Sequence, residues 1–250
     1  MDGKKEKVSV RSVGIVGYGN FGSFVHVLLK RFAPSIPVRV FEPKKEVDGK
    51  VFFPLNEVAK CDVVILAVPI RVFESVVKKL APHLSAQTIL VDVSTVKVHT
   101  YRILKRLAPG RFISTHPMWG PESYRKRGGD VSGFRIVIAG HNLPEKTVTS
   151  FARMLGRIGF KVLQMDADKH DKNLAETLFL THFIGQIVTR AGFVRTDIDT
   201  VSFGYLMDAV ESVREDKALF RDVFRFNRYC MSVLKKFGLS ERAVKKMLQR

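Results

Sequence analysis

The segment Ser114–Ser123, which reads Ser-Thr-His-Pro-Met-Trp-Gly-Pro-Glu-Ser, contains the side chain best suited to chemistry in this chain. Pro117, Gly120 and Pro121 restrict the backbone near His116, so we expect a rigid loop that holds the imidazole in one place. Histidine titrates nearest neutral pH and can accept or release a proton during a reaction. The alternative is a histidine that only caps backbone groups where a strand meets a loop.

A glycine-rich motif near the N-terminus follows an apolar run and precedes a helical pattern. It fits G-x-G-x-x-G, the fingerprint of dinucleotide-binding turns. Gly17 permits the tight turn, Gly19 lets the backbone approach a pyrophosphate, and Gly22 allows close packing of the next helix, whose N-terminus would face the phosphates. We therefore predict a dinucleotide site made by Gly17, Tyr18, Gly19, Asn20, Phe21 and Gly22.

Two later segments add to this predicted nucleotide site. Glu42 ends a β-rich run, where a carboxylate can accept hydrogen bonds from both ribose hydroxyls and would repel the extra phosphate of NADP. This favours NAD, although Lys44 and Lys45 follow directly and could soften the preference, so NADP stays open. Ala67, Val68 and Pro69 end an apolar run, where ligands of parallel sheets lie, and we expect them to form an apolar wall for the cofactor.

The order of predicted elements indicates the fold class. Apolar and β-branched runs alternate with helical patterns through the first two thirds of the chain, which is typical of a Rossmann-type, doubly wound parallel sheet. We expect strands over 8–16, 38–42, 62–68, 88–93, 111–115, 134–139 and 161–164. We expect helices between them over 21–32, 71–80, 98–107 and 145–158.

The pattern changes near Asp166, and no convincing strand follows. Helices are expected over 174–189, 200–213, 218–237 and 240–248. The sequence therefore predicts a dinucleotide-binding domain over 1–168 and a smaller, all-helical domain over 169–250.

The composition limits the classes of function. The net charge is +18, with 42 Lys and Arg against 24 Asp and Glu. A nucleic-acid partner would fit such a charge, but the basic residues are spread along the chain and no standard nucleic-acid module is present, so we do not expect that role. A positive surface also attracts a pyrophosphate and an anionic substrate. The absence of a long apolar run, the charged N-terminus and two distant cysteines predict a cytoplasmic protein with reduced thiols and no membrane span.

With these residues in hand, the chain resembles the prephenate/arogenate dehydrogenase family of tyrosine biosynthesis. The resemblance covers nearly the whole chain, and the loop around His116 is most similar to plant arogenate dehydrogenases. It is carried in order by the glycine motif, 62–69, 92–97, 115–123, 170–171, 181–182 and the segment ending at 226–228. Such enzymes oxidise a cyclohexadienol, pass its hydride to a nicotinamide, and release carbon dioxide as the ring becomes aromatic, without a metal. A related hydroxyacid dehydrogenase or imine reductase, and a non-catalytic nucleotide-binding regulatory protein, remain the alternatives.

The resemblance implies roles for residues of the first domain. His116 would hydrogen-bond the substrate hydroxyl and take its proton, and Thr95 stands where the family has a serine that orients the histidine and substrate. Ser94 is a rival for that role, and Lys97 would hold the loop or an anion, unless it is simply solvated. The loop would contact the substrate through Trp119, Gly120, Glu122 and Ser123. The basic segment 124–129 is either a mobile lid over the anionic substrate or a solvated loop.

In the helical domain the resemblance places His182 in the active site, whereas its apolar neighbours alone favour a core residue. The family's arginine for a substrate carboxylate aligns with Glu211, one turn before Arg214. Arg214 or another basic residue has taken that role, or the acidic residue favours arogenate, which carries an ammonium where prephenate has a keto group. The pair His170–Asp171 is at least as consistent with a structural hydrogen bond. The helical domain is expected to form a homodimer.

Overall fold

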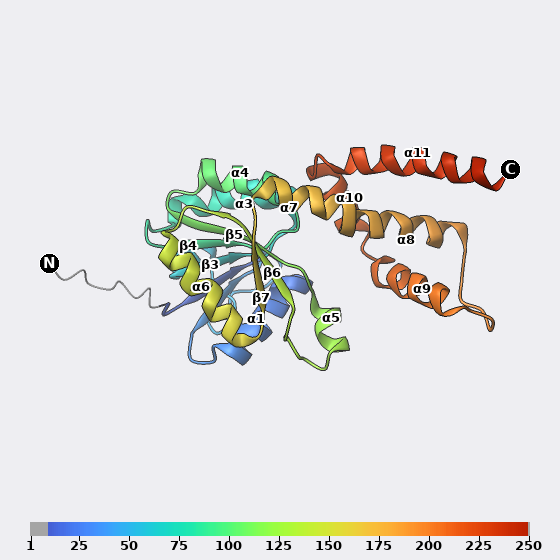
Figure 1. Ribbon diagram of the computed structural model, residues 1–250. Coiled ribbons are helices and arrows are strands. Elements are labelled where there is room, and N and C mark those ends of the chain that lie inside the picture. Colours follow the sequence, from blue (N-terminus) through green and yellow to red (C-terminus); the bar gives the residue numbers. More distant parts are fainter. Residues whose placement is uncertain (1–9, 250) are drawn as a thin grey trace. The chain divides into compact units, whose positions relative to one another are not determined.

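Seven short strands form one sheet in the order β2-β1-β3-β4-β5-β6-β7 (Figure 1). The computed structural model describes residues 10–249, and the chain divides into two units, 1–167 and 168–250, called unit 1 and unit 2 below. The strands belong to unit 1 and are β1 (Val13–Val16), β2 (Val38–Phe41), β3 (Val63–Leu66), β4 (Ile89–Asp92), β5 (Arg111–Pro117), β6 (Arg135–His141) and β7 (Lys161–Gln164). The predicted fold class, a Rossmann-type sheet followed by a helical part, is confirmed.

The sheet is parallel except at one place. The chain runs from β1 to β2 and then crosses back over β1 to β3, so the strand order reverses between β1 and β3. Ligands of such sheets bind at the carboxyl ends of the strands beside this reversal. The structure departs from the predicted parallel sheet at β6, which pairs antiparallel with β5, because residues 118–134 return the chain without a crossover helix across the sheet.

Helices cover both faces of the sheet. The helices are α1 (Asn20–Phe32), α2 (Leu55–Val58), α3 (Ile70–Leu80), α4 (Lys97–Leu107), α5 (Pro121–Lys126) and α6 (Glu145–Ile158). On one face Phe73 of α3 and Leu104 of α4 pack with Leu66 and Leu90. On the other, the core contains Val25 of α1 and Val148 of α6. Each strand therefore has apolar side chains on both faces, which fixes its place in the sheet.

Unit 2 is helical. Its elements are α7 (Ala167–Leu174), a π-helical turn (Ala175–Phe179), α8 (Leu180–Ala191), α9 (Val201–Val213), α10 (Lys217–Phe226) and α11 (Cys230–Leu248). Helices α8 and α9 pack closely at Gly185, where an added Cβ would lie 2.6 Å from Val213. Fully buried Phe179 stacks with Phe183, Phe220 and Phe224 at centroid distances of 6.2, 5.3 and 5.9 Å.

Two predictions about the last helices were wrong. The predicted helix 218–237 is broken at Asn227, whose side-chain amide donates to the Asp171 carbonyl (2.7 Å) and accepts from the Tyr229 amide (3.0 Å). The predicted break before Ser240 is absent, because α11 continues through Gly238. The strand predicted from Val8 begins at Val13 in the structure, and residues 8 and 9 lie outside the described range. No helix between residues 10 and 249 is both long enough and apolar enough to cross a bilayer.

Candidate active site

The glycine loop Gly17–Gly22 connects β1 to α1 at the carboxyl edge of the sheet. Gly17 has φ of +96°, and a Cβ there would lie 2.5 Å from the Ala67 carbonyl oxygen. A Cβ on Gly22 would lie 2.1 Å from the Gly17 carbonyl oxygen. In contrast, a Cβ on Gly19 would meet no protein atom within 4 Å. The fold itself thus requires two of the glycines, whereas the third leaves open space that a ligand's phosphates could approach.

The other residues predicted to bind the cofactor gather at the same edge. Helix α1 starts at Asn20 and Phe21, and its N-cap, Gly19, has no side chain to satisfy the first amide groups. The Glu42 carboxylate follows β2 and accepts a hydrogen bond from the Tyr18 amide (2.9 Å). Ala67 follows β3, and its amide donates to the Val16 carbonyl (2.9 Å), which brings Ala67, Val68 and Pro69 against the loop. A helix N-terminus with open amides suits a pyrophosphate.

A buried cluster joins the ends of β4 and β5. We call it the Asp92 cluster; its members are Asp92, Lys97, Thr100, Ser114 and Thr115, which are all at most 2% exposed. Oδ2 of Asp92 accepts from Lys97 Nζ (2.6 Å), Thr100 Oγ1 (2.7 Å) and Ser114 Oγ (2.8 Å), and Oδ1 accepts from the Ser94 amide (2.8 Å). Lys97 also donates to the Thr115 carbonyl (2.6 Å). The alternative that Lys97 is a solvated lysine is therefore wrong.

His116 directly follows this cluster and is 5% exposed. The expectation that it lies in a loop was wrong: β5 continues through His116 to Pro117, and His116 pairs with Val137 of β6. The strand tolerates Pro117 because it is the last residue of β5, and the Met118 amide resumes the bonding by donating to Arg135 (2.9 Å). The ladder shifts its register between Ser114 and Thr115, one residue before His116.

The hydroxyl groups proposed to accompany His116 come from the turn after β4. Thr95 is half-buried, and Ser94 is buried with a hydroxyl oxygen that has no hydrogen-bond partner. This turn is held in place because the Ser94 amide binds Asp92. Ser94 therefore offers a free polar atom to a ligand.

The segment after β5 was predicted to contact the substrate, and in the structure Trp119 of this segment also packs in the core of unit 1. Trp119 packs face to face with Phe134 and Phe160 at centroid distances of 5.0 and 5.3 Å, and edge to face with Phe24 at 5.4 Å. Its ring belongs to the aromatic core below α5, although its Nε1 is buried without a partner. Gly120 caps α5, and Glu122 and Ser123 are exposed on that helix, where Glu122 pairs with Lys126 (2.8 Å).

Residues 124–129, for which the sequence leaves a mobile lid and a solvated loop open, begin in a helix, continue as a turn and are largely exposed. Residues 121–126 form α5, and the Arg31 guanidinium of α1 donates to the Tyr124 hydroxyl and to the Gly129 carbonyl (2.7 Å). The Arg127 guanidinium lies over the Phe134 ring at 4.8 Å. These contacts anchor the segment to unit 1.

In unit 2, His182 and Arg214 present buried nitrogen atoms without hydrogen-bond partners. His182 Nδ1 lies 2.9 Å from the Leu178 carbonyl, which can only accept, so this nitrogen carries the proton. Nε2 is therefore an acceptor while the ring is neutral, with Asp216 Oδ2 at 3.8 Å. The Nε atom of Arg214 is the unpartnered donor, while the Arg214 carbonyl is fixed by Gln186 (3.1 Å).

Glu211, which aligns with the family's arginine, has an ion-pair partner that was not predicted from the sequence. Arg195 binds Glu211 (Nε to Oε1, 2.9 Å) and Asp208 (2.6 Å). The hydrogen bond from Arg195 holds the pKa of Glu211 below its usual range. Arg195 lies in the irregular segment before α9, where spacing gives no signal of its contacts.

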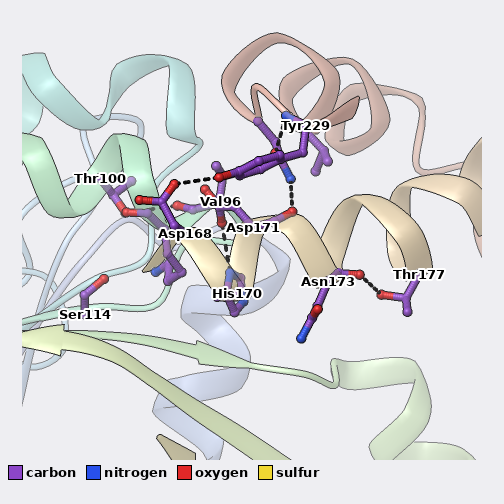
Figure 2. A network of polar contacts seen from close by, with 12 residues as sticks. Val96, Thr100, Ser114, Asp168, His170, Asp171, Asn173, Thr177 and Tyr229 are labelled. Atoms are coloured by element: carbon purple, nitrogen blue, oxygen red, sulfur yellow. Dashed lines mark hydrogen bonds and ion pairs between the residues drawn. The ribbon is translucent and has the colours of Figure 1, made fainter. Parts of the chain in front are cut away.

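The pair His170–Asp171 is a structural feature of unit 2. Both side chains are buried, and His170 Nδ1 lies 2.9 Å from Asp171 Oδ1. Figure 2 shows Tyr229 reaching Asp168 beside them, where its hydroxyl donates to Oδ1 (2.9 Å). Together with Asn227, these bonds fasten the start of α7 to the break between α10 and α11.

Within residues 10–249, four buried side-chain polar atoms lack a hydrogen-bond partner, and they belong to Ser94, Trp119, His182 and Arg214. All four residues were predicted from the sequence to contact the substrate. Unpartnered buried polar atoms are rare and costly in folded proteins. No group of three or more His, Cys, Asp or Glu side chains that could hold a metal ion occurs in this described part.

The sheet, its strand order and the glycine loop define a Rossmann-type dinucleotide-binding protein. Comparison with known proteins makes this more specific. Residues 45–135, which include the Asp92 cluster and His116, match the family described as prephenate dehydrogenase, nucleotide-binding domain. The resemblance to the prephenate/arogenate dehydrogenase family is thereby confirmed.

Individual relatives agree with this assignment. The chain is 29% identical to arogenate dehydrogenase 1, chloroplastic, of Arabidopsis thaliana over 94% of its length, but spans only 39% of that relative. It is 26% identical to the cyclohexadienyl dehydrogenase of Zymomonas mobilis, covering 87% of this chain and 81% of the relative. A solved prephenate dehydrogenase from A. aeolicus, in complex with hydroxyphenyl propionate and NAD+, has the same fold, with a TM-score of 0.77, 21% identity, and coverage of 98% and 93%.

Proposed function

We propose that this protein is a nicotinamide-dependent oxidoreductase that converts prephenate to 4-hydroxyphenylpyruvate, or arogenate to tyrosine, with loss of carbon dioxide. The observation that carries the proposal is that unit 1 combines an open glycine loop after β1 with a buried histidine near the end of β5 in the same sheet. The names of the relatives support it, since they include arogenate, cyclohexadienyl and prephenate dehydrogenases.

The chemistry follows from the substrate and the residues available. A bound nicotinamide supplies the acceptor for the hydride that leaves the carbon bearing the hydroxyl. Neutral His116 accepts the hydroxyl proton as the carbonyl forms, and the hydroxyls of Thr95 and Ser94 orient the substrate and imidazole. The ring then gains aromaticity as its carboxylate leaves as carbon dioxide, which drives the reaction forward.

Substrate recognition is assigned to polar groups that the fold leaves unpartnered. Arg214 would donate from Nε to a substrate carboxylate, and His182 Nε2 would accept from a hydroxyl or ammonium group. Glu211 is the departure from the family pattern, and it shares Arg195 with Asp208. If Glu211 sets the preference for arogenate, Glu211→Arg should lower the ratio of arogenate to prephenate turnover; an unchanged ratio would refute this assignment.

NAD is the proposed cofactor. Gly19 and the N-terminus of α1 would hold the pyrophosphate, and Glu42 would accept bonds from the ribose hydroxyls. The contact between Glu42 and the Tyr18 amide keeps the carboxylate at the edge of the loop, where it would repel a 2′-phosphate. NADP is the alternative because Lys44 and Lys45 are exposed on the following turn.

A homodimer through unit 2 is also proposed. Several large apolar side chains of this unit are exposed, and where such side chains form a contiguous patch they mark an interaction site. In the segment before and within α9 these are Phe193, Val194, Ile198, Val201 and Tyr205, and near the end of α11 they are Leu239, Val244, Met247 and Leu248. Sedimentation velocity would test this, with a monomer at micromolar concentration as the contrary result.

The first experiment is turnover of prephenate and arogenate in parallel, each with NAD and with NADP, followed by the absorbance of the reduced nicotinamide. Turnover of either substrate would establish the proposal, and the four rates would set both preferences. NAD binding without turnover of either substrate would overturn it and favour a related hydroxyacid dehydrogenase or a non-catalytic binding protein. Assays with simple 2- and 3-hydroxyacids would separate those two.

A further inference from the structure

The peptide group that enters His116 is held by a side chain from another element. The carbonyl of Thr115 and the amide of His116 belong to the same planar peptide unit, so fixing one fixes the other. Lys97 Nζ at the start of α4 donates to that carbonyl at 2.6 Å. The bond therefore restrains the backbone from which the His116 imidazole projects.

The ammonium of Lys97 is itself fixed by the Asp92 carboxylate at 2.6 Å. Both side chains are 0% exposed, and the hydroxyls of Thr100 and Ser114 complete the bonding of the carboxylate. Thr115 adds a further link, since its Oγ1 donates to the Asp92 carbonyl (2.8 Å). The cluster thus connects α4 and β4 to the residue directly before His116.

Stability alone does not explain a buried ion pair at this place. Replacing such pairs by apolar residues of similar volume is often neutral or stabilising, because the desolvation of two charges offsets their attraction. What an apolar residue cannot do is bind a backbone carbonyl. The β5–β6 ladder shifts its register between Ser114 and Thr115, where regular pairing is interrupted and local backbone groups need other partners.

We propose that Lys97, held by Asp92, is a positioning residue that sets the orientation of His116 through the Thr115 carbonyl. This inference rests on the proposed function, in which His116 is the proton acceptor. Lys97 touches neither substrate nor cofactor in this role. Its contribution is to keep the imidazole within the narrow range of positions from which proton transfer is efficient, since a displacement of about 1 Å can cost roughly 100-fold in rate.

The test is the double variant Lys97→Met/Asp92→Asn, which removes both charges together and keeps the volume. We expect it to fold, to bind NAD with unchanged Kd and to retain the substrate KM within about threefold, while kcat falls roughly 10- to 100-fold. Asn142→Ala is the matched control. The Asn142 side chain also bonds the backbone of β5, but at the opposite end, to the Phe112 amide (2.7 Å), and its loss should leave kcat within about twofold.

A folded double variant with a kcat like that of Asn142→Ala would overturn the proposal. A raised KM with an unchanged kcat would overturn it as well. Lys97→Gln/Asp92→Asn is the second variant, in case the first does not fold, because Lys97→Gln alone would leave the buried Asp92 carboxylate without its counter-charge. The glutamine side chain is shorter than that of Lys97 and cannot reach the Thr115 carbonyl as Lys97 does. The kcat should therefore fall again while the KM stays unchanged.

A readout without turnover separates this inference from the proposed function. In the double variant the His116 amide should exchange with solvent at least roughly tenfold faster than in the wild type, while that of Val91 in β4 stays unchanged. If the wild type turns over no substrate but this selective change occurs, the proposed function fails and the positioning device stands. If the His116 amide keeps its protection, the positioning role is refuted even in an active enzyme.

Discussion

The buried polar atoms of the Asp92 cluster in unit 1 are all hydrogen-bonded, whereas two residues of unit 2, His182 and Arg214, each have a buried nitrogen that is not. In the cluster a carboxylate receives four hydrogen bonds, and its ion-paired lysine also binds a backbone carbonyl. In unit 2 an imidazole nitrogen and a guanidinium nitrogen are buried without a hydrogen-bond partner. Leaving a buried donor or acceptor unpaired costs about 1–3 kcal/mol, so the second arrangement needs a reason.

We interpret this difference in hydrogen bonding as a difference in role, between holding a group in place and recognising a ligand. A network that must hold a catalytic group in place is completed by the fold, because any unfilled bond would let it move. Groups that must recognise a ligand are left incomplete, and the ligand supplies the missing partners. If this distinction is correct, changes in the cluster alter kcat, and changes in the unpartnered groups alter KM.

The largest expected effect concerns the residue that the cluster supports. His116→Asn keeps a polar side chain of similar size but removes the proton acceptor, so kcat should fall by about 10²- to 10⁴-fold. NAD affinity should not change, because the glycine loop is intact. Steady-state turnover and NAD titration would show this together. Retention of a tenth of the wild-type kcat would mean that His116 is not the base.

Arg214 provides the next test, since it should act on recognition alone. Arg214→Gln removes a charged donor to a substrate carboxylate, worth about 1.5–3 kcal/mol, so the substrate KM should rise roughly 10- to 100-fold. Arg195→Gln is the matched control, because that guanidinium is already occupied by Asp208 and Glu211. Equal effects of the two variants on KM would remove the distinction between partnered and unpartnered groups.

The glycine loop contains one glycine with open space beside it, Gly19, and one packed against the protein backbone, Gly22. Gly19→Ala adds a methyl group that meets no protein atom, so stability should be unchanged while the Kd for NAD rises roughly tenfold, about 1.4 kcal/mol. Gly22→Ala places its methyl group against the Gly17 carbonyl, and the unfolding free energy should fall by more than about 1 kcal/mol. Thermal unfolding and NAD titration of both variants would reveal whether the two glycines have these separate roles.

Much of the fold could be predicted because its signals are local. The edges of α6 and β7 were predicted at the residues found, since hydrophobic periodicity and flanking Gly and Pro determine them. The antiparallel β6 and the break at Asn227 could not be predicted, because each depends on partners far along the chain. Asn227 stops α10 by bonding the Asp171 carbonyl, 56 residues earlier.

In the candidate site, too, the features with a local signal could be predicted, and those that depend on distant residues could not. The glycine loop was recognisable because one short motif contains all three glycines: Gly17 for the tight turn, Gly19 for the approach to the pyrophosphate and Gly22 for the packing of the helix. The role of Lys97 was left open by the sequence, since nothing local shows that the side chain turns inward to Asp92 and the Thr115 carbonyl. The stacking of the Trp119 ring on Phe134 and Phe160 was not predicted, because it depends on residues far along the chain.

The smallest expected effect concerns His26, which lies beneath the glycine loop and bonds the Tyr18 hydroxyl through Nδ1 (3.0 Å). Burial, and then the charge of Lys30, lower the pKa of His26 from its ordinary value. The unfolded chain therefore binds this proton more readily, so the His26 contribution is complete above about pH 6.5 and is lost as the pH falls below that value.

Urea unfolding of the wild type and His26→Gln at pH 7.5, 6.5 and 5.5 would isolate this contribution, because the other histidines are common to both proteins. The difference in unfolding free energy should shrink with falling pH. A difference that grew instead would mean that the fold favours protonated His26, which contradicts the direction set by its burial. In that case protonated His26 would donate a charge-assisted hydrogen bond to the uncharged Tyr18 hydroxyl.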